Sequence, residues 1–194
     1  MMRKLKLMAV SSLLYLACSG AAYANTVMVK IDALNAMSQV EFEQTLGDIE
    51  KAPWAISEAA EKRPFTGFVD LYENIIVSIK KSDPKMQLEL IRNHPELACK
   101  SVRIKEINEH SQKEQTGSGL NQCTEEEVAL LQKMNMEYSK KFGFPFMLAV
   151  KGFNKEEIIQ EFKVRLQNTQ EQEFNSALQQ VYKVVLMRLL DRVK

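Results

Sequence analysis

The stretch TEEEVALLQKMNMEYSKKFG, residues 124–143, indicates the fold class of this sequence more clearly than any other. It begins with Thr124, a good helix N-cap, and three glutamates follow where the first helical turn would be. Two lysines occupy the last turn, and Gly143 follows them, a common residue just beyond a helix C-terminus. The spacing predicts one long helix between Thr124 and Gly143.

Helical signals recur on both sides of this stretch, and glycine and proline are scarce, with 7 and 5 in 194 residues. Only NTVMVKI (25–31) hints at a strand. We therefore predict an all-α protein, a single helical-bundle domain of about eight helices. Further helices are predicted in SQVEFEQTL (38–46), PWAISEAAEK (53–62), GFVDLYENIIVSIKKS (67–82), PKMQLELIRN (84–93), KEEIIQEFKVRL (155–166) and EFNSALQQVYKVVLMRLLDRV (173–193).

A secretory signal peptide is predicted at residues 1–24, ahead of the helical domain at residues 25–194. The first residues are basic, and the apolar LMAVSSLLYLA that follows is shorter than the roughly 20 residues a membrane span needs. Ala22 and Ala24 then form an A-x-A cleavage site before Asn25. We expect cleavage after Ala24 and an exported, periplasmic protein. Lipoprotein processing at Cys18 is the weaker alternative.

The domain at 25–194 carries a small negative charge, because removing residues 1–24 changes the formal net charge from +1 to −2. This gives no electrostatic reason to expect nucleic acid, or a membrane after signal cleavage, as a partner. Cys99 and Cys123 remain in this domain, and they form either one disulfide or two free thiols. No CxxC or CxH spacing is present, so no metal site is predicted.

His94 and Pro95, in RNHPELACK (92–100), directly follow a predicted helix. Proline disfavours helical backbone at the residue before it, so His94 is expected in a turn or extended conformation at the helix end. Such a position can direct an imidazole into a cleft. For a single histidine-proline pair, a capping or core histidine is the more common explanation.

Two further polar or irregular stretches could contribute to a site. In SQKEQTGSGL (111–120), Ser111, Glu114 and Gln115 share one helix face, although Ser-x-x-Glu is also a capping-box pattern. In KKFGFPFMLAVKG (140–152), glycine and proline end a helix before an apolar run that is too short for another. Backbone groups in an extended segment can bind a ligand rich in nitrogen and oxygen, although a plain connector is the default explanation.

Together these stretches resemble a known family. HPELA (94–98), SQKEQTGSGL and KFGFPFMLAVKG (141–152), in this order, are similar to motifs of the 2-oxo-4-hydroxy-4-carboxy-5-ureidoimidazoline (OHCU) decarboxylases of urate degradation. MSQVEFEQTLGDIEKAPW (37–54) and KRPFTG (62–67) resemble that family's N-terminal half. The resemblance therefore covers most of the chain. It departs from the family at Cys99, Ser118 and Cys123, where Gly, Ala and an apolar residue are usual.

The resemblance implies an all-helical fold, no cofactor, and decarboxylation of OHCU, a small-molecule substrate, to S-allantoin. His94 would be the catalytic proton donor, and Glu114 its catalytic partner. A homodimer is left open. The substrate contacts that the resemblance implies are Pro95, Ser111, Gln115, Phe146, Met147, Leu148, Ala149 and Val150.

This chemistry is physically reasonable for a protein without a cofactor. Loss of CO₂ leaves an electron pair that the imine of the substrate can accept, and a proton must then reach one face of the product. Histidine titrates near neutral pH, and a carboxylate at Glu114 could hold it as imidazolium. The alternative is a non-catalytic periplasmic helical binding module that uses the same pocket. Metal binding fits less well, because His110 has no partner at a ligand spacing and is expected near the surface.

Overall fold

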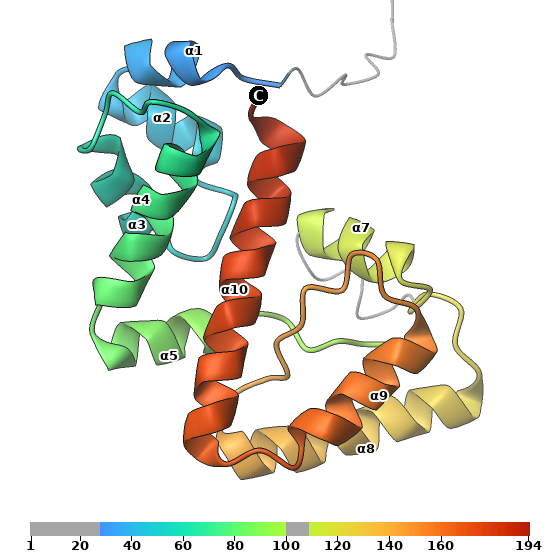
Figure 1. The fold of residues 1–194 in the computed structure, drawn as a ribbon. Helices are drawn as coiled ribbons and strands as arrows, with labels where there is room; N and C mark the ends of the chain where they lie inside the picture. Colours follow the sequence, from blue (N-terminus) through green and yellow to red (C-terminus); the bar gives the residue numbers. More distant parts are fainter. Residues whose placement is uncertain (1–27, 100–108) are drawn as a thin grey trace, which may run out of the picture.

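The computed structural model describes residues 28–99 and 109–194, and this part of the chain is built from helices (Figure 1). The predicted all-α class is confirmed, and the nine helices in the described residues are close to the expected number. The signal peptide predicted at residues 1–24 lies outside them. The helices are α1 (Ile31–Ala36), α2 (Gln39–Leu46), α3 (Pro53–Ala60), α4 (Phe68–Lys81), α5 (Pro84–Arg92), α7 (Glu109–Gly117), α8 (Glu125–Phe142), α9 (Lys155–Arg165) and α10 (Gln170–Arg192).

Local sequence signals set the helix ends. Thr124 caps α8 in a capping box with Glu127, and Gly143 ends the helix with a positive φ of 77°. That left-handed conformation suits glycine, which has no Cβ to clash. Ser38 forms a capping box with Glu41 at the start of α2. The helices therefore begin and end close to the predicted positions.

The long helix α10 is the centre of the arrangement. In Figure 1 it runs between α1–α5 on one side and α7–α9 on the other, and it packs against α4, α5 and α8. Val181, Val185 and Leu189 of α10 are fully buried. Side chains of α10 can therefore reach loops that come from both halves of the chain.

An aromatic cluster fixes the extended segment that follows α8. The Tyr138 ring lies 5.2 Å from the Phe146 ring, and the Phe146 ring stacks on Phe162 of α9 at 3.7 Å between centroids. Arg165 lies over the other side of this cluster and donates from Nε to Glu173 Oε1 at 2.9 Å. Buried aromatic pairs and a paired buried charge hold residues 144–150 in place without secondary structure.

The strand suggested at 25–31 is reduced to a single bridge in the described residues. Val29 pairs in parallel with Val193, and the chain enters α1 at Ile31. The Val29 amide donates to Arg192 O at 2.8 Å, and Lys194 donates to Val29 O at 2.9 Å. This contact joins the first described residues to the end of α10. Across both described ranges, no helix combines the length and apolar character needed to cross a membrane.

Candidate active site

His94 lies in the turn after α5, as the proline that follows it predicts. Its backbone amide donates to Ile91 O at 3.1 Å, and its ring Nδ1 lies 2.8 Å from Leu90 O. The residue is only 8% exposed. The imidazole thus closes the C-terminal end of α5, where the helix dipole favours a positive charge. Capping the helix leaves the second ring nitrogen, Nε2, for another partner.

The predicted polar face lies on α7. Ser111 and Gln115 are buried, and the Glu114 side chain is about one-fifth exposed. Helix α7 already includes Glu109, so Ser111 lies inside the helix and does not cap its start. The capping-box interpretation of Ser111 and Glu114 is therefore wrong.

The turn after α5, helix α7 and the segment after α8 meet at one small cavity beside α10. All of the predicted site residues except Ala149 line it. Leu97, Val184 and Arg188 complete the lining that the structure describes. The predicted residues in the lining are His94, Pro95, Ser111, Glu114, Gln115, Phe146, Met147, Leu148 and Val150.

This cavity has a volume of about 30 Å³. Small-molecule sites usually have several hundred Å³. A ligand of the size of OHCU must therefore displace some of the lining side chains. The polar side chains of the predicted site nevertheless converge on this cavity. We therefore identify it as the candidate site by the chemistry of its lining and not by its volume.

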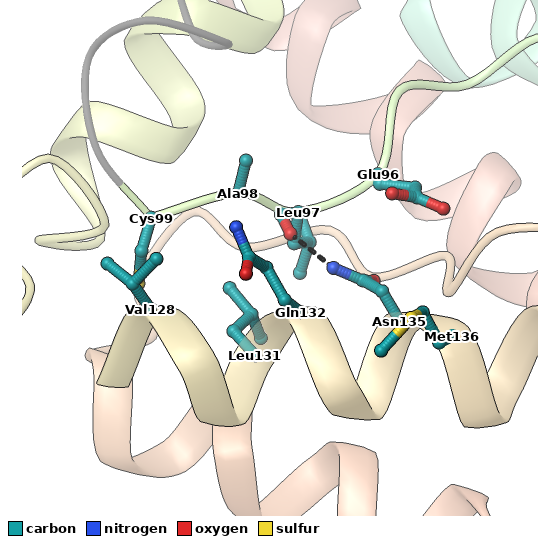
Figure 2. A pocket seen from close by; sticks show the side chains of 9 residues that line it. All are labelled: Glu96, Leu97, Ala98, Cys99, Val128, Leu131, Gln132, Asn135 and Met136. Carbon is teal, nitrogen blue, oxygen red and sulfur yellow. Dashed lines mark hydrogen bonds between the residues drawn. The ribbon is translucent and has the colours of Figure 1, made fainter. Parts of the chain in front are cut away.

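A larger cavity, of about 500 Å³, lies on the other side of the turn after α5. Figure 2 shows it between residues 96–99 and one face of α8, with Asn135 Nδ2 donating to Leu97 O at 2.8 Å. Leu97 lines both cavities. None of the predicted site residues lines this larger space, so it is separate from the candidate site.

Glu114 is paired with Arg188, a residue of α10 that the sequence analysis did not select. Arg188 donates from Nε to Glu114 Oε1 at 2.8 Å and from Nη2 to Oε2 at 2.9 Å. It also donates to Ile49 O at 3.1 Å and to Ser111 Oγ at 3.4 Å. The guanidinium is 4% exposed and therefore fixed in the cavity wall. The sequence signal that could have revealed Arg188 is its position among the apolar residues from Val184 to Leu189 in the last predicted helix.

The carboxylate that contacts His94 belongs to Glu50, in the loop between α2 and α3. His94 Nε2 lies 2.8 Å from Glu50 Oε1, and the Glu50 side chain has no exposed surface. The contact is an ion pair that is not aligned as a hydrogen bond. Glu114 was expected from the sequence to hold the imidazole, and the structure instead places Glu50 against it. An acidic residue between Ile49 and Ala52, both buried, was the available signal.

The charges in this site shift the pKa values of the His94–Glu50 pair in opposite directions. Burial by itself lowers the pKa of His94, but the Glu50 carboxylate and the bond to Leu90 O outweigh it, and the pKa is raised. Burial by itself raises the pKa of Glu50, but His94 and, to a smaller extent, Arg188 outweigh it, and the pKa is lowered. Both shifts favour the form of the pair in which His94 is imidazolium and Glu50 is carboxylate.

Gln115 and the segment after α8 have partly structural roles. Gln115 Oε1 accepts from Ala98 N at 3.2 Å, and its Nε2 donates to Glu96 O at 3.4 Å, so it holds the turn that carries His94. Met147 O accepts from Arg165 at 2.6 Å, and Ala149 N donates to Gln180 at 3.1 Å. Those two backbone groups are already paired, which narrows the backbone positions that a ligand can use.

Cys99 and Cys123 form a disulfide, with their Cα atoms 5.7 Å apart. Of the two alternatives that the sequence left open, the structure has the bond. It joins the end of the His94 turn to the residue before the Thr124 cap of α8. The bond therefore ties the chain on either side of α7.

His110 lies outside the candidate cavity. It is on the first turn of α7, about one-third exposed, with Nε2 3.2 Å from Asp48 Oδ2. Asp48 also accepts from Arg192 at 2.9 Å. Among the described residues, no three histidine, cysteine, aspartate or glutamate side chains gather as metal ligands would.

An all-helical domain with a buried histidine-carboxylate pair beside a small polar cavity is suited to proton transfer on a small molecule. Residues 35–190 match the family model described as OHCU decarboxylase. The chain belongs to the OHCU decarboxylase family. It is 32% identical over 163 residues to the 2-oxo-4-hydroxy-4-carboxy-5-ureidoimidazoline decarboxylase of Xenopus laevis, and the match covers 83% of this chain and 93% of that protein.

Two other similarities cover a smaller share of the related protein. The chain is 38% identical over 163 residues to the uric acid degradation bifunctional protein of Bacillus sp. (strain TB-90); the match covers 84% of this chain but only 32% of that protein. The crystal structure of an (S)-allantoin synthase superposes with a TM-score of 0.70 at 26% identity, covering 86% of this chain and 54% of that one. The chain spans about a third of the bifunctional relative and about half of the synthase.

Proposed function

We propose that this protein decarboxylates OHCU to S-allantoin in urate degradation, as a cofactor-independent carboxy-lyase. The observation that carries the proposal is the buried contact between His94 and Glu50, because His94 lines a cavity that Ser111 and Glu114 also line. Family membership and the decarboxylases among its relatives support it. The alternative of a non-catalytic periplasmic binding module is not favoured, because the histidine that turnover needs as an acid is present and faces a buried carboxylate.

In the proposed reaction the bond between the carboxylate and the ring carbon of OHCU breaks, and CO₂ leaves. The electron pair passes into the adjacent imine of the substrate. His94 then donates a proton to the carbon that bears the ureido group, and donation to one face gives a single enantiomer. Backbone groups of Phe146 and Leu148 and the hydroxyl of Ser111 orient the substrate.

Glu114 and Arg188 supply the remaining polar surface. Their paired hydrogen bonds keep a guanidinium at the cavity wall, where it can bind and orient the carboxylate of the substrate. Glu114 thereby contributes through Arg188, and its assignment as the catalytic partner of His94 stays a prediction. Glu114→Gln, assayed with fresh OHCU, tests this assignment.

We also propose that the protein is exported to the periplasm after cleavage behind Ala24. The basic start, the short apolar stretch and the A-x-A site support this, and the Cys99–Cys123 disulfide suits an oxidising compartment. N-terminal sequencing of the protein from a periplasmic extract should begin at Asn25. A lipid-modified Cys18 or a full-length cytoplasmic chain would contradict it. Assembly as a homodimer stays a prediction, which sedimentation velocity checks.

A further inference from the structure

The Glu50 carboxylate occupies an unusual position for an acidic side chain. It has no exposed surface, and its Oε2 accepts no hydrogen bond from any described residue. Oε1 accepts from the Lys51 amide at 2.6 Å and faces His94 Nε2 at 2.8 Å. A buried carboxylate is costly unless a positive charge compensates for it. The contact with His94 is the nearest compensation that the described residues provide.

The hydrogen bond on the other side of the ring fixes the protonation pattern. A carbonyl oxygen only accepts, so the bond between His94 Nδ1 and Leu90 O requires a hydrogen on Nδ1. A neutral ring would then turn the lone pair of Nε2 toward the Glu50 carboxylate at 2.8 Å, which is repulsive. A proton between Nε2 and Glu50 removes this repulsion. His94 and Glu50 together therefore bind one proton more than a neutral imidazole beside an ionised carboxylate would.

Other charged groups around His94 do not replace Glu50. Arg188 on α10 opposes a positive charge on the ring. Glu114 on α7 faces the same cavity, but both of its oxygens accept from Arg188. The segment 146–150 contributes apolar side chains. Glu50 is therefore the group that makes a buried imidazolium favourable here.

We propose that Glu50 is a positioning residue that holds His94 as imidazolium, with the transferable proton on Nε2. The proposal rests on the decarboxylase function proposed above. Because the contact is not aligned as a hydrogen bond, the Nε2 proton is not committed to Glu50 alone and can pass to a substrate carbon in the cavity. After transfer, the lone pair of Nε2 again faces the carboxylate. This repulsion draws a proton from water and restores the acid for the next turnover.

The protonation state can be observed without any substrate, because the chain has two histidines. With ¹⁵N-labelled histidine, NMR at pH 7 should show both ring nitrogens of His94 protonated. Glu50→Gln keeps the size of the side chain but removes its charge, so His94 should become neutral, with hydrogen on Nδ1 only. A neutral His94 in the unsubstituted protein, or an unchanged imidazolium in Glu50→Gln, would overturn the proposal. If the variant fails to fold, the spectrum of the unsubstituted protein still tests whether His94 is imidazolium.

Asp48→Asn is the matched control, since it removes a nearby carboxylate that contacts His110 and Arg192. It should change the His110 signals, leave those of His94 as they are, and preserve turnover of OHCU. Glu50→Gln should lower kcat by about 10²-fold, the usual scale for a positioned acid, with KM nearly unchanged. Glu50→Asp should restore part of kcat.

These readouts separate the two proposals. If the unsubstituted protein does not accelerate OHCU decarboxylation, the proposed function fails, and the NMR result still decides the state of His94. If turnover is present and Glu50→Gln retains it near pH 7, Glu50 does not act through His94. A pH profile of kcat for Glu50→Gln that falls at lower pH than that of the unsubstituted protein supports the proposal.

Discussion

His94 Nε2 lies 2.8 Å from Glu50 Oε1, and neither side chain is appreciably exposed to solvent. The two residues come from different loops, one after α5 and one between α2 and α3. Leu90 O holds the opposite ring nitrogen, so the imidazole is fixed at both ends. This pairing favours a positive charge on a buried imidazole, and the proposed decarboxylation needs such a proton donor.

The pair should make stability depend on pH. The folded state raises the pKa of His94 above 6.5, so its contribution is fully present below that value and is lost as pH rises through the folded pKa. The folded state lowers the pKa of Glu50 below 4.5, so its contribution is present above that value and is lost as pH falls through the folded pKa. Tm measured from pH 2 to 9 should therefore pass through a broad maximum.

Glu50→Gln should flatten both sides of this maximum, because it removes the charge that shifts His94. Asp48→Asn provides the control on the alkaline side and should leave the loss of stability at high pH unchanged. It can change the acid side, because Arg192 and His110 outweigh burial and lower the pKa of Asp48. If the stability of Glu50→Gln falls in parallel with that of the unsubstituted protein at both low and high pH, the His94–Glu50 pair does not contribute as described.

Glu114 and Arg188 should behave as one unit in stability measurements. Glu114→Ala leaves a buried guanidinium without its carboxylate and should lower the free energy of unfolding by about 3 kcal/mol. Arg188→Met removes the buried charge, so the double variant should be less destabilised than the sum of the two single ones. Urea denaturation gives the free energy of unfolding of the unsubstituted protein, the two single variants and the double variant. Strictly additive effects would show that the two side chains are not coupled.

The disulfide should stabilise the domain mainly by restricting the unfolded chain. Its two cysteines are 24 residues apart, and a loop of that size contributes about 3 kcal/mol on the chain-entropy model. Replacing both Cys99 and Cys123 by alanine should lower the unfolding free energy by that amount. A reductant should destabilise the unsubstituted protein and leave the double variant unaffected. Finding two free thiols on denaturation without reductant would rule out the bond.

His94→Gln separates a catalytic role from a purely capping one. The variant cannot donate the proton, so turnover should fall by roughly 10²-fold or more. Because His94 also contacts Leu90 O and compensates for the buried Glu50 carboxylate, a loss of stability of about 3 kcal/mol is expected as well. Turnover and Tm are measured on the same preparation. Normal turnover with a lowered Tm would mean that His94 is a cap only.

The sequence predicted what local chemistry controls. Thr124 and Gly143 mark the ends of α8 because a cap and a left-handed glycine act within one helical turn. The turn at His94 follows from Pro95 alone. These features can be recognised without knowledge of the tertiary structure.

The partners of the site residues could not be predicted in the same way. Arg188 lies 74 residues from Glu114, and Glu50 comes from a loop in the N-terminal half of the chain. Periodicity shows which face of a helix is buried, but not which distant charge meets it. For that reason Glu114 was expected beside His94, and the contact was in fact made by Glu50.

In the proposed reaction this chain turns OHCU into S-allantoin with His94 as the acid. The most direct measurement supplies freshly generated OHCU and follows allantoin by circular dichroism, with the unsubstituted protein, with His94→Gln and without protein. We predict rapid formation of the S enantiomer with the unsubstituted protein and a rate close to the spontaneous one with His94→Gln. Racemic product at the spontaneous rate in all three samples would contradict the account.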